Sequence, residues 1–197
     1  LQDQLQALAH REGILKWDLG ASRSSSASVQ VDRGQAKQLK AAQRSSITIR
    51  VWNQQGLVGI TSTSDLSDSG LEKALMGAHQ ASCFGNPDDV PGFSPLATAP
   101  EPDLHRPIQD AQGIQCLLKQ LLDAEQQLLD RHPAIGTLPY NAMNEGSSER
   151  IYMNSEGALR QAQRTQASVF LMARAEETGR KPRSGGAVRV ALGSRDL

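Results

Sequence analysis

The feature that most constrains the fold of this chain is an alternation of apolar and polar residues in two separate blocks. In the first block, residues 26–62, the apolar positions are Ala27, Val29 and Val31, followed by Ile47, Ile49 and Val51. A period of two places one side of a strand on a core and the other side toward solvent. Asp32-Arg33-Gly34 and Asn53-Gln54-Gln55-Gly56 have the composition of tight turns. The block therefore predicts an antiparallel meander.

The second block begins after residue 148. Ile151 and Met153 alternate with polar residues up to a turn at Asn154-Ser155-Glu156-Gly157. Residues 158–164 and 165–176 are predicted as two further strands, and a short turn separates them from a last strand. The apolar positions of these later strands are Val169, Leu171 and Ala173, then Val188, Val190 and Leu192. The chain therefore returns to strand structure in its second half.

Three other stretches have helical periodicity. Residues 1–12 carry a leucine stripe that ends near Gly13, and Ser67 is a candidate cap for a second helix that ends near Gly85. The clearest helix covers residues 110–131. Its broad apolar face consists of Ile114, Leu117, Leu118, Leu121, Leu122, Leu128 and Leu129. We expect this face to belong to the core.

A proline-rich segment separates the two halves. Residues 86–107 hold six of the nine prolines and almost no periodicity, which predicts a linker or an extended crossing over the surface. We therefore predict an α+β fold with antiparallel sheets and packed helices. Its predicted parts are a first α+β subunit at 1–88, a linker at 89–109 and a second α+β subunit at 110–197.

The two halves have similar patterns. A shift of 122 positions aligns Val29 with Ile151, Val31 with Met153, Ile47 with Val169 and Ile49 with Leu171. This suggests the hypothesis that both subunits arose by internal duplication. The chain begins at Leu1 rather than Met and stops abruptly at Leu197, so we expect it to be part of a longer protein.

The charge balance argues against a dedicated nucleic-acid domain. The chain has 21 basic and 21 acidic residues and a pI near 7.1. Charge is nevertheless uneven, because residues 160–197 hold eight basic and three acidic side chains, a net charge of +5. A basic sheet face can bind polyanions, but Phe170 is the one aromatic residue in that stretch. A solvated face, or one that meets an acidic partner, is the favoured interpretation.

The cysteines and the absence of sorting signals indicate the compartment. Cys83 and Cys116 lie in predicted helices outside any CxxC pair, and we expect two buried, reduced thiols. No stretch has the length and apolarity of a membrane span, and no secretion signal is visible. We expect a cytoplasmic protein that does not associate with membranes.

No residue of this chain is assigned a catalytic, cofactor-binding or metal-binding role. The four histidines, His10, His79, His105 and His132, lack the spacing of a zinc motif. His79 and Cys83 could share a helix face, but a third orienting group is missing. The serines at 22, 24, 25, 26 and 28 are predicted as a polar loop, and Ser184-Gly185-Gly186 as a turn.

Several short motifs nevertheless resemble the TldD/PmbA family, once named modulators of DNA gyrase. The first is Gly59-Ile60-Thr61-Ser62-Thr63-Ser64-Asp65-Leu66-Ser67 after a glycine turn, and the second is Cys83-Phe84-Gly85-Asn86-Pro87-Asp88. The third is Asn154-Ser155-Glu156-Gly157, followed by Arg164-Thr165 and Ala173-Arg174-Ala175-Glu176-Glu177. Their order and spacing span nearly the whole chain. The Ser-Thr-Ser-Asp-Leu-Ser form is closer to the PmbA (TldE) branch.

The resemblance implies a role in a cytosolic peptidase assembly. In that family a TldD-type subunit carries an HExxxH zinc site, a PmbA/TldE-type subunit pairs with it, and the substrates are unfolded polypeptides. This chain then corresponds to the N-terminal domain of a non-catalytic subunit that pairs with a TldD-like protein or with itself. Zinc is expected in a partner or in a C-terminal part beyond this sequence.

Two other functions remain open at this point. One is a nucleic-acid or gyrase-binding module, which the old family name and the basic stretch suggest and the neutral pI disfavours. The other is the N-terminal half of an active zinc metalloprotease, which a downstream HExxxH would establish.

Overall fold

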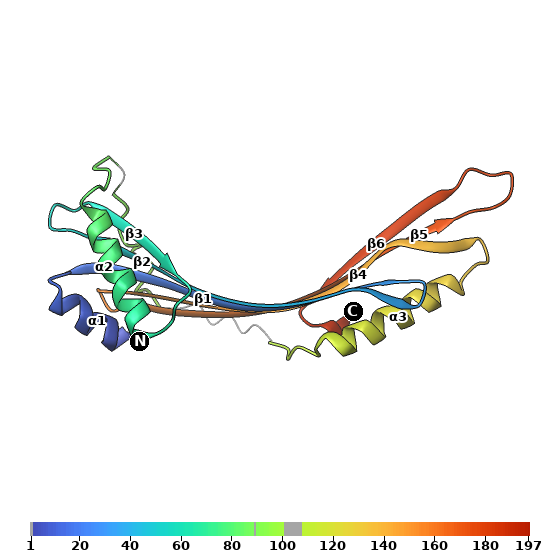
Figure 1. Cartoon of the computed structure of the whole chain (residues 1–197), viewed down its shortest axis with the longest axis horizontal. Coiled ribbons are helices and arrows are strands. Elements are labelled where there is room, and N and C mark those ends of the chain that lie inside the picture. The colour runs from blue at the N-terminus through green and yellow to red at the C-terminus, as the bar shows by residue number, and fades with distance from the viewer. Residues whose placement is uncertain (1, 89, 101–107) are drawn as a thin grey trace. The chain divides into compact units, whose positions relative to one another are not determined.

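The computed structural model describes residues 2–88, 90–100 and 108–197. It confirms the predicted α+β class, with one antiparallel sheet of six strands in the order β3-β2-β1-β4-β5-β6 (Figure 1). The strands are β1 Lys16–Asp32, β2 Gln35–Trp52, β3 Val58–Thr63, β4 Ile135–Asn154, β5 Leu159–Ala175 and β6 Arg183–Ala191. The helices are α1 Gln2–Arg11, α2 Asp68–Ser82, α3 Ile114–Leu129 and the short 3-10 helix η1 Ser194–Asp196. No helix in the described ranges is long and apolar enough to cross a membrane.

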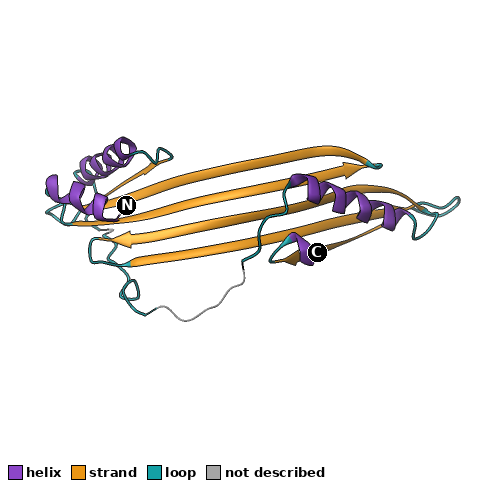
Figure 2. Ribbon diagram, turned by 90° about the horizontal axis from the view of Figure 1, so that it is seen from below, coloured by secondary structure: helices purple, strands orange, loops and turns teal. Residues whose placement is uncertain are grey.

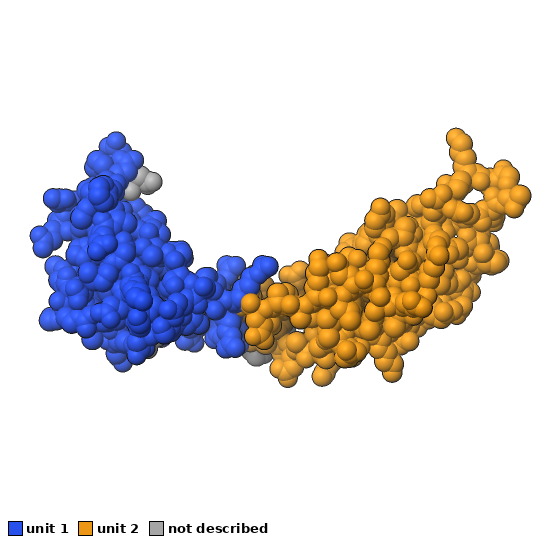
Figure 3. Space-filling view, viewed as in Figure 1, with its two compact units in different colours: residues 1–23, 44–104, 149–163 blue, residues 24–43, 105–148, 164–197 orange. Residues whose placement is uncertain are grey.

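Two compact units make up the chain, and each combines three separate segments (Figure 3). Unit 1 contains residues 1–23, 44–104 and 149–163, and unit 2 contains residues 24–43, 105–148 and 164–197. The sequence division at 1–88 and 110–197 follows the chain in order, whereas each long strand contributes one end to each unit. Internal duplication remains a hypothesis.

The core of unit 1 forms where α1 and α2 cover one side of the strands. Its fully buried side chains come from alternating strand positions and from one side of each helix. The positions on β2 were predicted, whereas the buried part of β1 lies before the predicted strand block. They include Leu5 from α1, Trp17 and Leu19 from β1, Ile49 and Val51 from β2, and Leu71 and Leu75 from α2. Ser67 caps α2 as predicted, because its hydroxyl accepts from the Gly70 amide at 3.1 Å.

Strand β3 lies unusually close to α2. A Cβ atom placed on Gly59 would come within 2.0 Å of the Ala78 carbonyl oxygen and 2.2 Å of the Ser82 nitrogen. Both atoms belong to the helix backbone, which cannot swing aside as a flexible side chain could. Glycine at position 59 is therefore what allows β3 to pack directly on α2.

Residues 90–100 belong to unit 1 and contain no helix or strand. The indole nitrogen of Trp52 donates to the Pro91 carbonyl at 3.0 Å, and the rings of Trp52 and Phe93 meet edge to face at 5.0 Å. The ammonium of Lys16 stands 4.9 Å and 4.8 Å from the centres of these two rings. The guanidinium of Arg160 donates to the Leu96 carbonyl at 3.2 Å. The part of the predicted linker at 101–107 lies outside the described residues.

The core of unit 2 forms under α3, which runs along one face of the strands (Figure 2). Leu117 and Leu121 are fully buried there, as predicted for this helix. They pack on Val29 and Val31 from β1, Met143 from β4, and Val169 and Leu171 from β5. The apolar positions of the first and second sequence blocks therefore meet in one core.

Two buried glutamates join distant segments of unit 2 by hydrogen bonds. Glu125 of α3 accepts from the Gly34 amide at 2.7 Å, in the β1–β2 turn, and from the Asn141 side chain at 3.0 Å. Glu145 of β4 accepts from the Gly113 amide at 2.8 Å, just before α3, and from the Ser194 hydroxyl at 2.7 Å. Each carboxylate thus binds segments that are distant in the sequence, and its burial is compensated by hydrogen bonds.

Several predicted boundaries are wrong. The serine cluster at 22–28 lies within β1 rather than in a loop, and residues 158–176 form essentially one strand, β5, instead of two. Ser184-Gly185-Gly186 lies within β6 rather than in a turn. Pairing to neighbouring strands overrides the local preference of serine and glycine. The hydroxyl pairs Ser22–Ser46 at 2.9 Å and Ser25–Ser147 at 2.8 Å join β1 to β2 and to β4.

We predict that Gly59→Ala lowers the free energy of unfolding by about 3 kcal/mol, because the new methyl group would overlap the backbone of α2. Urea denaturation followed by circular dichroism measures the change. Gly20→Ala is the matched control, since a Cβ at Gly20 meets nothing within 4 Å. A G59A chain as stable as the control would contradict the close packing of β3 on α2.

We also predict that Glu145→Gln lowers the free energy of unfolding by about 1–3 kcal/mol, because the amide keeps one acceptor oxygen and replaces the other with an NH2 group that cannot accept. The same denaturation experiment applies, with the exposed Glu156→Gln as the control. Equal stability of the two variants would show that Glu145 does not fasten the segment before α3 to β4.

Candidate functional site

The candidate histidines that the structure describes lie on different elements. His10 lies in the last turn of α1 and His79 in the last turn of α2. His132 follows α3 and accepts from the Ala134 amide at 3.1 Å, while His105 lies outside the described residues. Across the described ranges, no three His, Cys, Asp or Glu side chains form a group that could hold a metal ion.

Both cysteines were predicted to be buried, and the structure shows that neither is. Cys83 is exposed because α2 ends at Ser82 and leaves Cys83 as its C-cap residue, and Cys116 is partly exposed. The Cys116 thiol donates to the Gln112 side-chain oxygen at 2.6 Å. Both cysteines are free thiols in the structure, which agrees with the prediction that they form no disulfide.

Unit 1 contains an ion pair whose carboxylate is buried. Asp18 is 2% exposed and accepts from Arg50 at 2.9 Å and from the Tyr152 hydroxyl at 3.2 Å. The hydrogen bond to Asp18 raises the pKa of Arg50, and burial, followed by the charge of Asp18, raises the pKa of Tyr152. Both shifts keep Arg50 cationic and Tyr152 neutral at pH 7. The cluster therefore joins β1, β2 and β4 within unit 1 by hydrogen bonds.

The sheet of unit 2 leaves one face uncovered. Residues of β4 and β5 alternate, so that Met143, Val169 and Leu171 pack beneath α3 and their neighbours point the other way. We call this second side the open face. It carries Asn144, Arg164, Gln166, Ser168 and Phe170, and also Val188 and Val190, which pair with Phe170 and Ser168 in the β5–β6 register.

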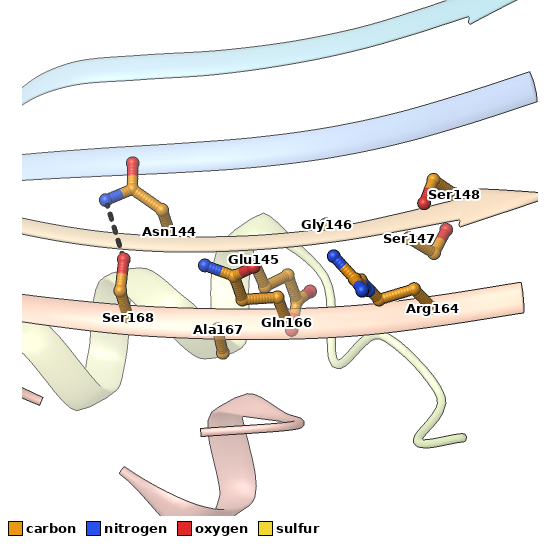
Figure 4. Close-up of a pocket in the computed structure, with 9 residues that line it drawn as sticks. All are labelled: Asn144, Glu145, Gly146, Ser147, Ser148, Arg164, Gln166, Ala167 and Ser168. Carbon is orange, nitrogen blue, oxygen red and sulfur yellow. Dashed lines mark hydrogen bonds between the residues drawn. The ribbon is translucent and has the colours of Figure 1, made fainter. Parts of the chain in front are cut away.

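A shallow hollow of about 300 Å³ lies between β4 and β5 in unit 2 (Figure 4). Arg164 extends from β5 toward Gly146, and the Asn144 side chain donates to the Ser168 hydroxyl at 3.4 Å. Among the described residues Arg164 has no ion-pair partner. The hollow thus offers a free guanidinium beside amide and hydroxyl groups, a set that can bind peptide groups or a carboxylate.

A second hollow of about 380 Å³ in unit 2 has a mixed lining. It includes Asp32 and Lys37 beside the β1–β2 turn, together with Tyr140 and Phe170. The Tyr140 side chain is 66% exposed. The alternation in sequence predicted the strands, but it gave no signal that this face would remain uncovered.

Strand β6 ends the sheet on the side of unit 2. It pairs antiparallel with β5 from Ala167↔Ala191 to Ala175↔Arg183, and no described strand follows it. All of its residues from Arg183 to Val190 are exposed. An edge strand presents unpaired backbone N–H and C=O groups to an incoming chain. The open face and the β6 edge can therefore bind an extended chain, and the described residues form no group of metal ligands beside them.

Comparison with known protein families matches both halves of the chain. Residues 17–81 match the model described as PmbA/TldA metallopeptidase domain 1, and residues 105–196 match the PmbA/TldA metallopeptidase central domain. A search of curated protein sequences gave no significant match.

Solved structures share the fold at low sequence identity. A candidate modulator of a DNA gyrase from Thermotoga maritima aligns with 100% of this chain at a TM-score of 0.84 and 19% identity. TldE from Thermococcus kodakarensis aligns with 96% at 0.76 and 14% identity. A candidate modulator of DNA gyrase from Bacteroides thetaiotaomicron aligns with 99% at 0.78 and 16% identity. The chain spans 44%, 43% and 45% of these proteins.

The predicted resemblance is thus confirmed by two consecutive domain matches and by the fold of the whole chain. This chain belongs to the PmbA/TldD metallopeptidase family and comprises its first and central domains.

Proposed function

We propose that this chain is the non-catalytic part of a peptidase assembly, in which it pairs with a zinc-bearing TldD-type subunit and holds unfolded polypeptide near the zinc site. The observation that carries the proposal is the match to two consecutive domains of a metallopeptidase family. The likeness to TldE from Thermococcus kodakarensis supports the PmbA/TldE-like role. The subunit acts in the cytoplasm.

The chemistry of peptide hydrolysis fits this division of labour. Metal-assisted hydrolysis needs a Lewis acid to polarise the carbonyl and a carboxylate to move protons. The residues described in this chain do not fit a zinc site, because no three ligand-type side chains gather there. Its buried carboxylates Asp18, Glu125 and Glu145 are already bound to protein donors. No step of the reaction is therefore assigned to this chain.

The described surfaces support peptide binding. The open face of unit 2 supplies Arg164 and amide groups, and β6 supplies an unpaired strand edge. Main-chain hydrogen bonds at such an edge bind extended chains with little dependence on sequence. That property suits a substrate that is an unfolded polypeptide rather than a folded protein.

A second function is suggested by the names of the related structures. Two of them are described as candidate modulators of DNA gyrase, so a gyrase- or nucleic-acid-binding module is the alternative. The net charge of zero weakens it, because non-specific DNA binding rests on an excess of basic residues.

The test is a reconstitution with the HExxxH-bearing protein of the same organism. We expect an unfolded, fluorescently labelled polypeptide to be cleaved by the mixture and by neither protein alone, and chelation of zinc to abolish cleavage. A variant of this chain with His10, His79, His105 and His132 all changed to Gln should remain active in the mixture. Loss of activity on changing the HExxxH histidines of the other protein is the matched positive control.

Three outcomes would contradict the proposal. Zinc-dependent cleavage by this protein alone would identify the active metalloprotease instead. Cleavage by the zinc-bearing protein that does not respond to this chain would remove the subunit role. Salt-sensitive binding to duplex DNA with no effect on proteolysis would favour the nucleic-acid alternative.

A further inference from the structure

The two faces of β6 carry different kinds of side chain. Because β6 pairs regularly with β5, Arg183 and Arg189 lie on the same face of the sheet as Val169. Val188 lies beside Phe170 on the open face. Val188 and Val190 are 67% and 59% exposed. An added strand would therefore meet arginines on one face and an apolar strip on the other.

Uncompensated positive charge is concentrated on this edge. Arg174 is paired with Glu176 at 2.6 Å and Arg180 with Glu177 at 2.9 Å. Arg183 and Arg189 have no ion-pair partner among the described residues. They lie six positions apart on the same side of the strand, about 20 Å at the usual rise per residue.

The same arginines disfavour a second copy of this chain as the occupant. Two β6 strands pairing antiparallel about Gly186 would place Arg183 of each copy opposite Arg189 of the other. Like charges directly opposite one another destabilise a strand pair, and charged residues on an edge are a common protection against such pairing. The edge is therefore better suited to a chain of opposite charge.

We propose that the β6 edge binds an extended, acidic polypeptide segment as an additional strand, with its carboxylates facing Arg183 and Arg189 and its apolar residues facing Val188 and Val190. The inference rests on the proposed function and names the substrate class of its peptide-holding surface. Acidic and apolar residues alternate in the segment that fits, with two acidic positions six residues apart. This pattern is the same in parallel and antiparallel orientation, so either can bind.

The test measures fluorescence anisotropy of labelled nine-residue peptides, the length of β6, with the 197-residue chain. We expect a peptide of alternating Glu and Val to bind, and its affinity to fall as salt rises. The comparison probes are a Lys–Val alternation, a peptide of the same Glu and Val composition in two blocks, and a DNA duplex. The peptide with Glu and Val in two blocks and the Lys–Val peptide should each bind at least about tenfold more weakly than the alternating Glu–Val peptide.

Charge reversal on the strand provides the matched variants. R183E/R189E should weaken binding of the acidic peptide by about tenfold or more and strengthen binding of the basic one. R131E/R150E makes the same change in net charge at exposed positions outside β6 and should leave both affinities unchanged. Circular dichroism checks that both variants are folded.

Two results would overturn the inference: equal loss of affinity in both double variants, or tighter binding of the peptide with Glu and Val in two blocks. Either would show that binding depends on net charge rather than on strand pairing. Duplex DNA that competes with the peptide at equal charge would do the same. Reconstituted proteolysis that persists unchanged with R183E/R189E would overturn the β6 site and leave the proposed function intact. Failure of the reconstitution itself would overturn the proposed function.

Discussion

The distribution of apolar residues along the long strands is the constraint on which the rest of the structure depends. Strand β1 gives Trp17 and Leu19 to the core of unit 1 and Val29 to the core of unit 2. Between these ends, residues 20–28 are largely serine, and none of them is buried. A sheet face needs a helix over it only where apolar side chains must be buried. The helices therefore cover the ends of β1 and leave its polar middle uncovered.

The same constraint accounts for the surfaces that are available for binding. Helix α3 covers one face of unit 2, so the side chains between the buried positions, such as Arg164 and Phe170, stay on the open face. Strand β6 contributes no residue to the core of unit 2, and no other described strand pairs with its outer edge. The buried carboxylates of Glu145 and Asp18, moreover, accept hydrogen bonds from the protein itself, which compensates their burial.

Sequence patterns predicted the elements whose formation depends on residues close together in the chain. The period of two found the buried positions of β2 and β5 and one end of β1, at Val29 and Val31, and the leucine stripe found α3. It missed the other buried end of β1, at Trp17. Sequence patterns failed where strand pairing determines the structure. The serines of β1 form a strand because Ser22 and Ser25 pair with the neighbouring strands. Glu125 and Glu145 gave no signal, since their partners are far away in the sequence. The uneven charge of residues 160–197 indicated a solvated sheet face. Alternation could not add which residues lie on it, because it shows that a strand has two sides but not which side a helix covers.

Amide hydrogen exchange of β6 tests the central claim most directly. The reconstituted assembly is compared with and without an unfolded, acidic polypeptide, and exchange is followed at the amides of residues 183–191. We predict that the outward-facing amides of β6 exchange rapidly without polypeptide and become protected when it is present, while Trp17 and Leu121 in the two cores stay protected throughout. Unchanged exchange in β6 under conditions where the polypeptide is bound would contradict the account, because the substrate would then be held elsewhere.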